Sequence, residues 1–312
     1  MKKLVGGVVL LLVVAAVVLW VLTAPKRVSA DALPPHTANL ANGETLFSIG
    51  GCASCHAASK DEREKLGGGV KLTTPFGTFY GPNISPDPTD GIGRWSEADF
   101  VSAMHDGTAP DGSHLYPAFP YPSYQRMTID DVRDLFAYLK TLPPVAGKAL
   151  PHALPFPYDI RRAVGLWKLL YLDGAVFRPD PQQSEEWNRG AYLVNGPGHC
   201  GECHTPRDAL GGKKESMRLA GGPDPEGKGW VPNITQKGLK DWSADDIAYL
   251  LETGMTPGFD TVGGSMADVI RNTKQLSAED RRAIAVYLKS LPAVDGPARP
   301  AAPAGAGGAA KS

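Results

Sequence analysis

Two copies of one five-residue pattern constrain this chain more than any other feature. The 312-residue sequence has four cysteines, and all of them fall in CASCH (52–56) and CGECH (200–204). In each copy the two thiols stand three positions apart, and a histidine directly follows the second thiol. The sequence therefore predicts two sites of the same kind in one chain.

The Cys-x-x-Cys-His spacing is typical of covalent attachment to a c-type haem. Two thiols at this spacing reach the two vinyl groups of one porphyrin, and the next residue is held under the iron as an axial ligand. That histidine must be neutral, and its other nitrogen usually donates to a backbone carbonyl. We therefore predict two molecules of haem c, attached through Cys52, Cys55, Cys200 and Cys203, with His56 and His204 as iron ligands.

Zinc binding and thiol–disulfide chemistry are the alternatives for these cysteines. A zinc site shared by two cysteine pairs normally has about 15–20 residues between the pairs, whereas residues 56–199 separate them here. A redox-active pair is expected inside a βαβ pattern, and the flanking sequence has none. Covalent haem attachment takes place outside the cytoplasmic membrane, so it also indicates the compartment of both sites.

The similarity between the two copies extends beyond the cysteines. The matching segments are LGGG (66–69) with LGGK (210–213), YGPNIS (80–85) with WVPNIT (230–235), RWSEADF (94–100) with DWSADDI (241–247), and 127–143 with 276–292. The offset is 144 residues for the first of these pairs and about 147 to 150 for the others, as expected for one duplicated unit. We place the first repeat at 38–145 and the second repeat at 185–293.

Each repeat predicts three helices joined by long loops. The first helix carries the cysteine motif near its end, at about 40–54 and about 186–202. The second begins at a capping box, in which a serine hydroxyl satisfies free backbone N–H groups of the first turn; these boxes are Ser96 with Asp99 and Ser243 with Asp246. The third covers 128–142 and 277–290, with apolar residues on one face. The predicted fold is all-α: two tandem helical domains, each relying on haem for apolar mass.

The segments outside the repeats have their own character. Residues 4–24 carry no charge and are long enough to cross a bilayer as a helix. We predict a membrane anchor at 1–25; a cleaved signal peptide, with a cleavage site near 28–30, is the alternative. The tail at 294–312 lacks bulky apolar residues, and we predict that it is disordered.

The linker at 146–184 contains one amphipathic stretch. Residues 159–174 place five apolar side chains on one side of a predicted helix. This helix is either a clasp between the two repeats or a docking site for a partner protein. Charge is balanced, with 32 Lys and Arg against 33 Asp and Glu, so no basic surface for nucleic acid is indicated.

The sixth iron ligand needs a separate argument in each repeat, because a thioether ligand favours reduced iron and blocks the open position. Met266 stands in the glycine-rich stretch GGSMADV, and we predict that it binds the second iron from a loop; Met255 and Met217 are the alternatives. The gap-free alignment of 95–119 with 242–266 places Phe119 opposite Met266. Since phenylalanine cannot ligate iron, we predict that Met127, eight residues later, binds the first iron.

Other ligands for the first iron remain open. His105 or His114 would make a bis-histidine site, and an open iron is the third alternative. The stretch SHLYPAFPYPSYQRM (113–127) contains three prolines, which argue against a helix. We predict that it forms a stiff aromatic wall over one porphyrin face, with Phe119 packed in it.

Four further residues recur at matching places in the two repeats. They are Asn83, Trp95, Asn233 and Trp242. Each is a candidate hydrogen-bond partner for a haem propionate, and the alternative is that each pins a loop.

The chain resembles the class I c-type cytochromes. More narrowly, it is similar to the membrane-bound cytochrome c subunits of bacterial alcohol, aldehyde and gluconate dehydrogenases. The resemblance covers about 38–293 and rests on both CxxCH motifs and on TPFGTFYGPNISPDPTDGIGRWS (74–96), LYPAFPYPSY (115–124), WNRGAYLV (187–194), GHCGECHTPR (198–207) and PNIT (232–235).

What the resemblance implies is partly met by this chain. The family's iron ligands are the motif histidine and a downstream methionine, which correspond to His56, His204 and Met266. The family has methionine where this chain has Phe119, and Met127 is our substitute. Family members typically carry three haem motifs, whereas this chain has two, which favours a stand-alone di-haem carrier.

These features predict a membrane-tethered protein that carries single electrons. The expected partners are a periplasmic dehydrogenase or quinol-oxidising complex as donor, and a terminal oxidase or soluble cytochrome as acceptor. The expected location is the bacterial inner membrane, with the haem domains facing the periplasm. The alternatives are a di-haem enzyme, such as a peroxidase or thiosulfate dehydrogenase, and a haem-based gas sensor.

Overall fold

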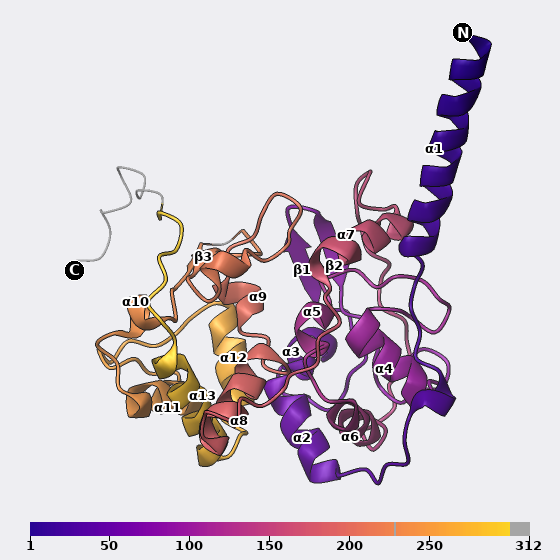
Figure 1. Cartoon of the computed structure of the whole chain (residues 1–312). Coiled ribbons are helices and arrows are strands. Elements are labelled where there is room, and N and C mark those ends of the chain that lie inside the picture. Colours follow the sequence, from indigo (N-terminus) through magenta and orange to yellow (C-terminus); the bar gives the residue numbers. More distant parts are fainter. Residues whose placement is uncertain (228, 300–312) are drawn as a thin grey trace, which may run out of the picture.

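The computed structural model describes residues 1–227 and 229–299 as helices joined by long loops (Figure 1). The mainly helical prediction is confirmed, with one addition that the sequence did not predict. Each repeat also contains a small antiparallel hairpin, formed by β1 (Lys71–Thr74) with β2 (Gly77–Tyr80) and by β3 (Gly222–Pro223) with β4 (Trp230–Val231).

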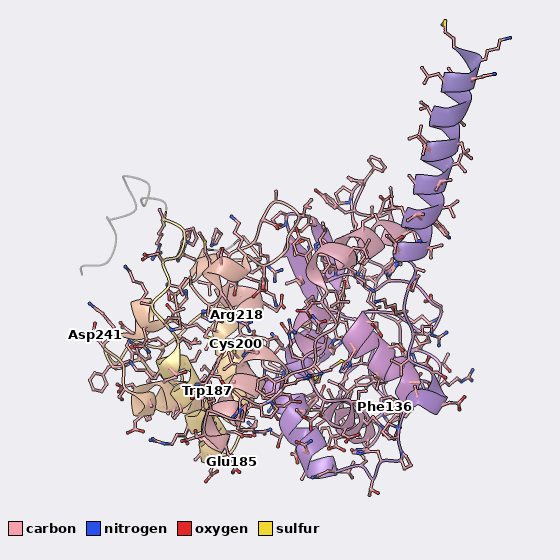
Figure 2. The ribbon with its side chains drawn as sticks, viewed as in Figure 1. Phe136, Glu185, Trp187, Cys200, Arg218 and Asp241 are labelled. Atoms are coloured by element: carbon pink, nitrogen blue, oxygen red, sulfur yellow. The ribbon has the colours of Figure 1, made fainter. Side chains whose placement is uncertain are left out.

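In the first repeat, the helices at the two ends of the repeat pack together. They are α2 (Leu40–Ile49) and α6 (Ile129–Leu139), and α4 (Glu97–Asp106) also packs on α6. The face of α6 predicted to be apolar is buried, with Val132, Leu135, Phe136 and Leu139 at 6% exposure or less. Figure 2 marks Phe136 within this group of helices.

The second repeat has the same arrangement. Helix α8 (Glu185–Asn195) packs on α13 (Ala278–Ser290), and α11 (Ala244–Thr253) packs on α13 as well. A short turn of helix, α10 (Gln236–Leu239), contacts α13, and α12 (Ser265–Thr273) lies against α11.

A glycine stands at the crossing point of each terminal helix pair. A Cβ added at Gly43 would lie 2.3 Å from the Asp134 carbonyl oxygen, and one added at Gly190 would lie 1.9 Å from the Ala283 carbonyl oxygen. Real Cβ atoms do not approach an oxygen so closely. Both helix pairs therefore cross with their backbones in direct contact, which only glycine allows.

The predicted first helix of each repeat is in fact two helices. In the first repeat α2 ends at Ile49, and α3 (Cys52–His56) starts after Gly51, whose φ of 61° is left-handed. In the second repeat α8 ends before α9 (Gly201–His204), and His199 has a φ of 39°. A left-handed residue cannot continue a right-handed helix. The break turns each cysteine motif away from the axis of the preceding helix.

Local start signals were predicted correctly. Both capping boxes form, because Ser96 accepts from the Asp99 N–H while the Asp99 carboxylate accepts from the Ser96 N–H, and Ser243 with Asp246 does the same. The proline-rich stretch departs from the prediction by one helical turn, α5 (Tyr121–Tyr124). Pro122 is tolerated there because the first turn of a helix needs no donor from it.

One helix points away from the rest of the molecule. Helix α1 (Lys2–Leu22) has a mean hydropathy of 3.0 and no buried residue, and by length and composition it can cross a membrane (Figure 1). Its last turn is tied to the body, because Arg162 donates to the carbonyls of Trp20 and Thr23 and lies 4.4 Å from the centre of the Trp20 ring.

The linker helix contacts both repeats. Helix α7 (Val164–Tyr171) follows a 3₁₀ turn at Arg161–Ala163. Lys168 donates to the carbonyls at the end of α4, while the Trp167 N–H donates to the Leu210 carbonyl and the Tyr171 hydroxyl to Asp208. These contacts are the ones expected of a clasp.

The tail prediction falls mostly outside the described residues. Residues 300–312 are not described. Within the described part, the Val294 carbonyl accepts from the Asn233 side chain, and Lys237 pairs with Asp295.

Candidate haem-attachment site

One continuous cavity of about 1770 Å³ brings the predicted residues together. Its wall includes all four cysteines and both motif histidines. It also includes the recurring tryptophans, Trp95 and Trp242, and the two candidate methionine ligands, Met127 and Met266. The cavity wall is mainly apolar, which fits a porphyrin ring. Figure 2 marks Cys200 near the centre of the second repeat.

The two motif histidines have the same environment. His56 Nδ1 lies 2.8 Å from the Pro82 carbonyl oxygen, and His204 Nδ1 lies 2.9 Å from the Pro232 carbonyl oxygen. Because a carbonyl only accepts, Nδ1 carries the proton and Nε2 keeps its lone pair. Burial lowers the pKa of both imidazoles below the usual value. Each histidine is thus neutral, with Nε2 prepared to bind a metal.

The four thiols fit covalent attachment better than metal binding. All four are free, and within the described residues no group of three or more His, Cys, Asp and Glu side chains could hold a metal ion. Burial raises the pKa of Cys52 and of Cys200 to about 12, so neither is a ready thiolate. In each motif the second thiol, at Cys55 and Cys203, is exposed along the cavity.

The candidate sixth ligands occupy two kinds of position. Met266 and Phe119 are both partly buried and both line the cavity, as their alignment predicts. Met266 lies in the first turn of α12, whereas the sequence predicts a loop there. Met127 lines the cavity and is completely buried, whereas its counterpart Leu276 is buried outside the cavity wall. Met127 therefore has access to the cavity that Leu276 lacks, and it remains a prediction as ligand.

The two alternative histidines lie away from the cavity wall. His105, at the end of α4, faces the Met127 carbonyl, and His114 lies against the end of α1, with Nε2 3.0 Å from the Thr23 carbonyl oxygen. Burial lowers the pKa of His114 to about 4. Neither imidazole is among the residues that face the space for a porphyrin.

The recurring asparagines and tryptophans differ in whether their side-chain donors are already hydrogen-bonded to the protein. The Asn83 amide donates to the Val145 and Gly147 carbonyls, and its oxygen accepts from Ser85. Asn233 has the corresponding bonds to Val294 and Thr235. Both amides therefore pin loops, and a contact with a propionate stays a prediction.

The two tryptophans retain free donors. Trp95 and Trp242 line the cavity, and within the described part of the chain no protein acceptor is recorded for either indole N–H. Each is available to a propionate.

Sequence reasoning missed the contacts that join the two motifs. The Tyr124 hydroxyl donates to the Gly50 carbonyl at 3.0 Å, and His199 Nε2 lies 3.2 Å from the same oxygen. The Tyr124 and His199 rings pack edge to face, with centroids 5.6 Å apart. Gly50 precedes the first motif and His199 precedes the second. The only local signal was a histidine where the first repeat has glycine.

These features are those expected of a helical haem-binding protein, and comparison with known proteins gives the family. The cytochrome c family profile matches residues 40–143. A diheme cytochrome c-type protein of Cereibacter sphaeroides is 52% identical over 297 residues, which is 94% of this chain and 99% of the relative.

More distant relatives are subunits of larger enzymes. The fructose dehydrogenase cytochrome subunit of Gluconobacter japonicus is 39% identical over 83% of this chain and 54% of its own length. The cytochrome c subunit of the quinone alcohol dehydrogenase of Gluconacetobacter polyoxogenes is 40% identical over 81% of this chain and 56% of its own. The chain belongs to the cytochrome c family. It spans about half the length of these two dehydrogenase subunits.

Proposed function

We propose that this chain is a membrane-tethered di-haem cytochrome c that carries single electrons between periplasmic redox partners. One haem c is attached to Cys52 and Cys55 in a domain at 38–145, and the other to Cys200 and Cys203 in a domain at 185–293. Bound haem supplies one-electron redox chemistry. The chain supplies the attachment, the axial ligands and the apolar surroundings that tune the potential.

The observation that carries this proposal is the pairing of two equivalent histidines along one cavity. His56 and His204 each donate Nδ1–H to a proline carbonyl and keep Nε2 free. The proposed sixth ligands are Met127 for the first site and Met266 for the second. Ligation from both sides leaves no position for substrate, so only an electron is transferred.

The two attachment sites are joined by a short series of bonds. From Cys52 the backbone runs through Gly51 to the Gly50 carbonyl, which meets His199, the residue directly before Cys200. Two redox sites in such contact form a relay within one chain, with one donor and one acceptor. Since relatives include cytochrome subunits of alcohol and fructose dehydrogenases, we propose a periplasmic dehydrogenase as donor.

The number of haems is tested on the purified mature protein. Denaturation in alkaline pyridine and reduction give a spectrum that counts thioether-linked haems per chain, and two are expected. The Cys200→Ala/Cys203→Ala variant should give one. A wild-type count of one or none would refute the proposal.

A di-haem enzyme is the second candidate, and Phe119 is the observation that favours it. This side chain lies where the second repeat has Met266, so the first iron has a free sixth position unless Met127 binds it. The ferric spectrum of Met127→Ala, with Met104→Ala as control, decides the matter. Loss of the thioether charge-transfer band at one haem supports Met127, whereas an unchanged spectrum and carbon monoxide binding by the untreated reduced protein favour the enzyme.

A further inference from the structure

The two repeats meet through a pair of equivalent hydrogen bonds. In the first, the Ser123 hydroxyl on α5 donates to the Glu202 carboxylate at 2.6 Å. In the second, the Asn272 amide on α12 donates to the Ser54 hydroxyl at 2.8 Å. Both bonds join residues from different repeats.

The four residues occupy matching positions. Ser54 and Glu202 each directly precede the second cysteine of their motif. Ser123 and Asn272 each stand four residues before an aligned pair, Met127 and Leu276. Position 123 therefore contacts motif 2 while its counterpart 272 contacts motif 1. Such an exchange is the mark of an isologous, two-fold interface, here within one chain.

Additional contacts support each bond. Lys213 and Arg207 bind the Glu202 carboxylate at 2.8 and 2.7 Å. Arg63 donates to the Asn272 amide oxygen at 3.2 Å, and Lys60 pairs with Asp268 on α12 at 3.2 Å.

The partners on α5 and α12 lie in the segments that carry the candidate sixth ligands. Met266 is in the first turn of α12, and Asn272 is in its last turn. Ser123 lies between Phe119 and Met127. Ser123 and Glu202 are 3% and 8% exposed, so water competes little for their bond. Asn272 is 5% exposed and its partner Ser54 is partly buried.

We propose that the sixth-ligand segment of each haem site is positioned by the attachment motif of the other site. Ser54, in the first motif, is then a positioning residue for Met266 at the second iron. Ser123 holds the first ligand segment against the second motif. Coupling of this kind is reciprocal, because any state that loosens one site weakens the contact that positions the other.

The proposal rests on the proposed function, because it requires Met266 to be an iron ligand. The test therefore begins with Met266→Leu. In the reduced holoprotein, the ring current of the porphyrin shifts the methyl resonance of a bound methionine far from all others, and this variant should lose one such resonance. If none is lost, the ligand assignment fails and the coupling fails with it.

The coupling itself is measured by adding imidazole, which displaces a thioether from ferric iron. Loss of the bond between Asn272 and Ser54 should make release of Met266 about fivefold more favourable. Ser54→Ala should therefore raise the imidazole affinity of the second haem about fivefold. Asn272→Leu removes this bond and also the one from Arg63, so it should raise the affinity at least as much. The double variant should then do no more than Asn272→Leu alone, because the bond to Ser54 is already lost in that variant.

The matched control is Ser59→Ala, the same substitution five residues further along. Within the described residues the Ser59 hydroxyl is hydrogen-bonded only to the N–H of Asp61, in its own turn, and imidazole affinity should be unchanged. If Met266→Leu loses its resonance but Ser54→Ala and Asn272→Leu both behave like Ser59→Ala, the coupling is refuted. A bond that adds only overall stability would lower the unfolding midpoint and leave imidazole affinity at the control value, which also refutes it.

Discussion

At the scale of single residues, the position before each motif differs between the repeats while its backbone is the same. Gly51 and His199 both have left-handed φ values. Glycine adopts this conformation without penalty, whereas a histidine there carries a strain of about 1 kcal/mol or more. The His199 side chain offsets this cost with its contacts to Gly50 and Tyr124 across the interface.

Gly51→Ala should destabilise the protein for two reasons. The left-handed backbone disfavours any Cβ, and this Cβ would lie 3.2 Å from the Asn272 amide nitrogen. We expect a loss of about 1–3 kcal/mol in the free energy of unfolding, measured by guanidinium denaturation of the holoprotein. Gly112→Ala, at φ 79° with open space around it, is the control for the backbone cost and should lose less. Equal losses would contradict the contact with Asn272.

Asp134 makes stability depend on pH. Burial alone would raise the pKa of this carboxyl, but bonds from the Asn39 N–H and from the Asn42 and His36 side chains hold it below its usual value of 3.8. A carboxyl with a lowered pKa stabilises the fold above its usual pKa, and this contribution disappears as the pH falls through the lowered value.

Asp134→Asn should therefore lower stability at pH 7 by about 1.5–3 kcal/mol, the usual contribution of hydrogen bonds to a charged group. The difference between wild type and variant should shrink as the pH is lowered below 3.8. Unfolding curves at pH 7 and pH 3 measure it. A difference that does not change with pH would show that the charge of Asp134 contributes nothing.

At the scale of elements, the crossing of the terminal helices sets the shape of each repeat. Gly43 lets α2 touch α6, and Gly190 lets α8 touch α13. The positions match in the two repeats: Gly43 meets Asp134 and Tyr138, and Gly190 meets Ala283 and Tyr287. The crossing thus determines the distance between α2 and α6, which both line the cavity, and between α13, which also lines it, and α8.

Gly43→Ala and Gly190→Ala should each destabilise the protein by about 1–3 kcal/mol or more. This loss would occur although alanine in a helix is favoured over glycine by about 1 kcal/mol, because the added methyl meets a carbonyl oxygen. Thermal unfolding followed in the haem absorption band measures the change. Gly258→Ala, in a loop with space around it, should change little, and stabilisation by Gly43→Ala would show that α2 and α6 do not touch.

A feature could be predicted when the residues that determine it lie close together in the sequence. Capping boxes and helix faces follow from residues within one or two turns, and Ser96, Ser243 and the apolar face of α6 were predicted correctly. The breaks before each motif were missed, since nothing near His199 marks a left-handed residue. The bonds of Ser123 and Asn272 join positions 79 and 218 residues apart, and no pattern in the sequence connects them.

At the scale of the whole molecule, the two repeats share one buried apolar cluster and one cavity. Helix α7 also contacts both repeats. Unfolding of one repeat therefore exposes apolar surface of the other. Haem bound in the shared cavity would fill the space that the side chains leave open, and its attachment should therefore be coupled to folding.

The Cys52→Ala/Cys55→Ala variant should retain haem only at the second motif and lose order in the first repeat. Because the shared interface then lacks one side, the second repeat should also unfold at lower guanidinium concentration than in wild type. Circular dichroism and haem absorption, recorded through the same titration, follow the two events. An unchanged midpoint for the remaining haem would show that the repeats fold independently.

The attachment of the end of α1 by Arg162 affects how the body can move toward a partner protein. With its last turn held by Arg162, and with Arg27 paired to Asp99 at 2.6 Å just beyond it, α1 has no slack segment at its junction with the body. In a bilayer the body would stand at a constant height and tilt above the lipid headgroups. A membrane-bound partner would then have to reach the body by lateral diffusion in the bilayer, since the body could not swing out on a flexible tether to meet it.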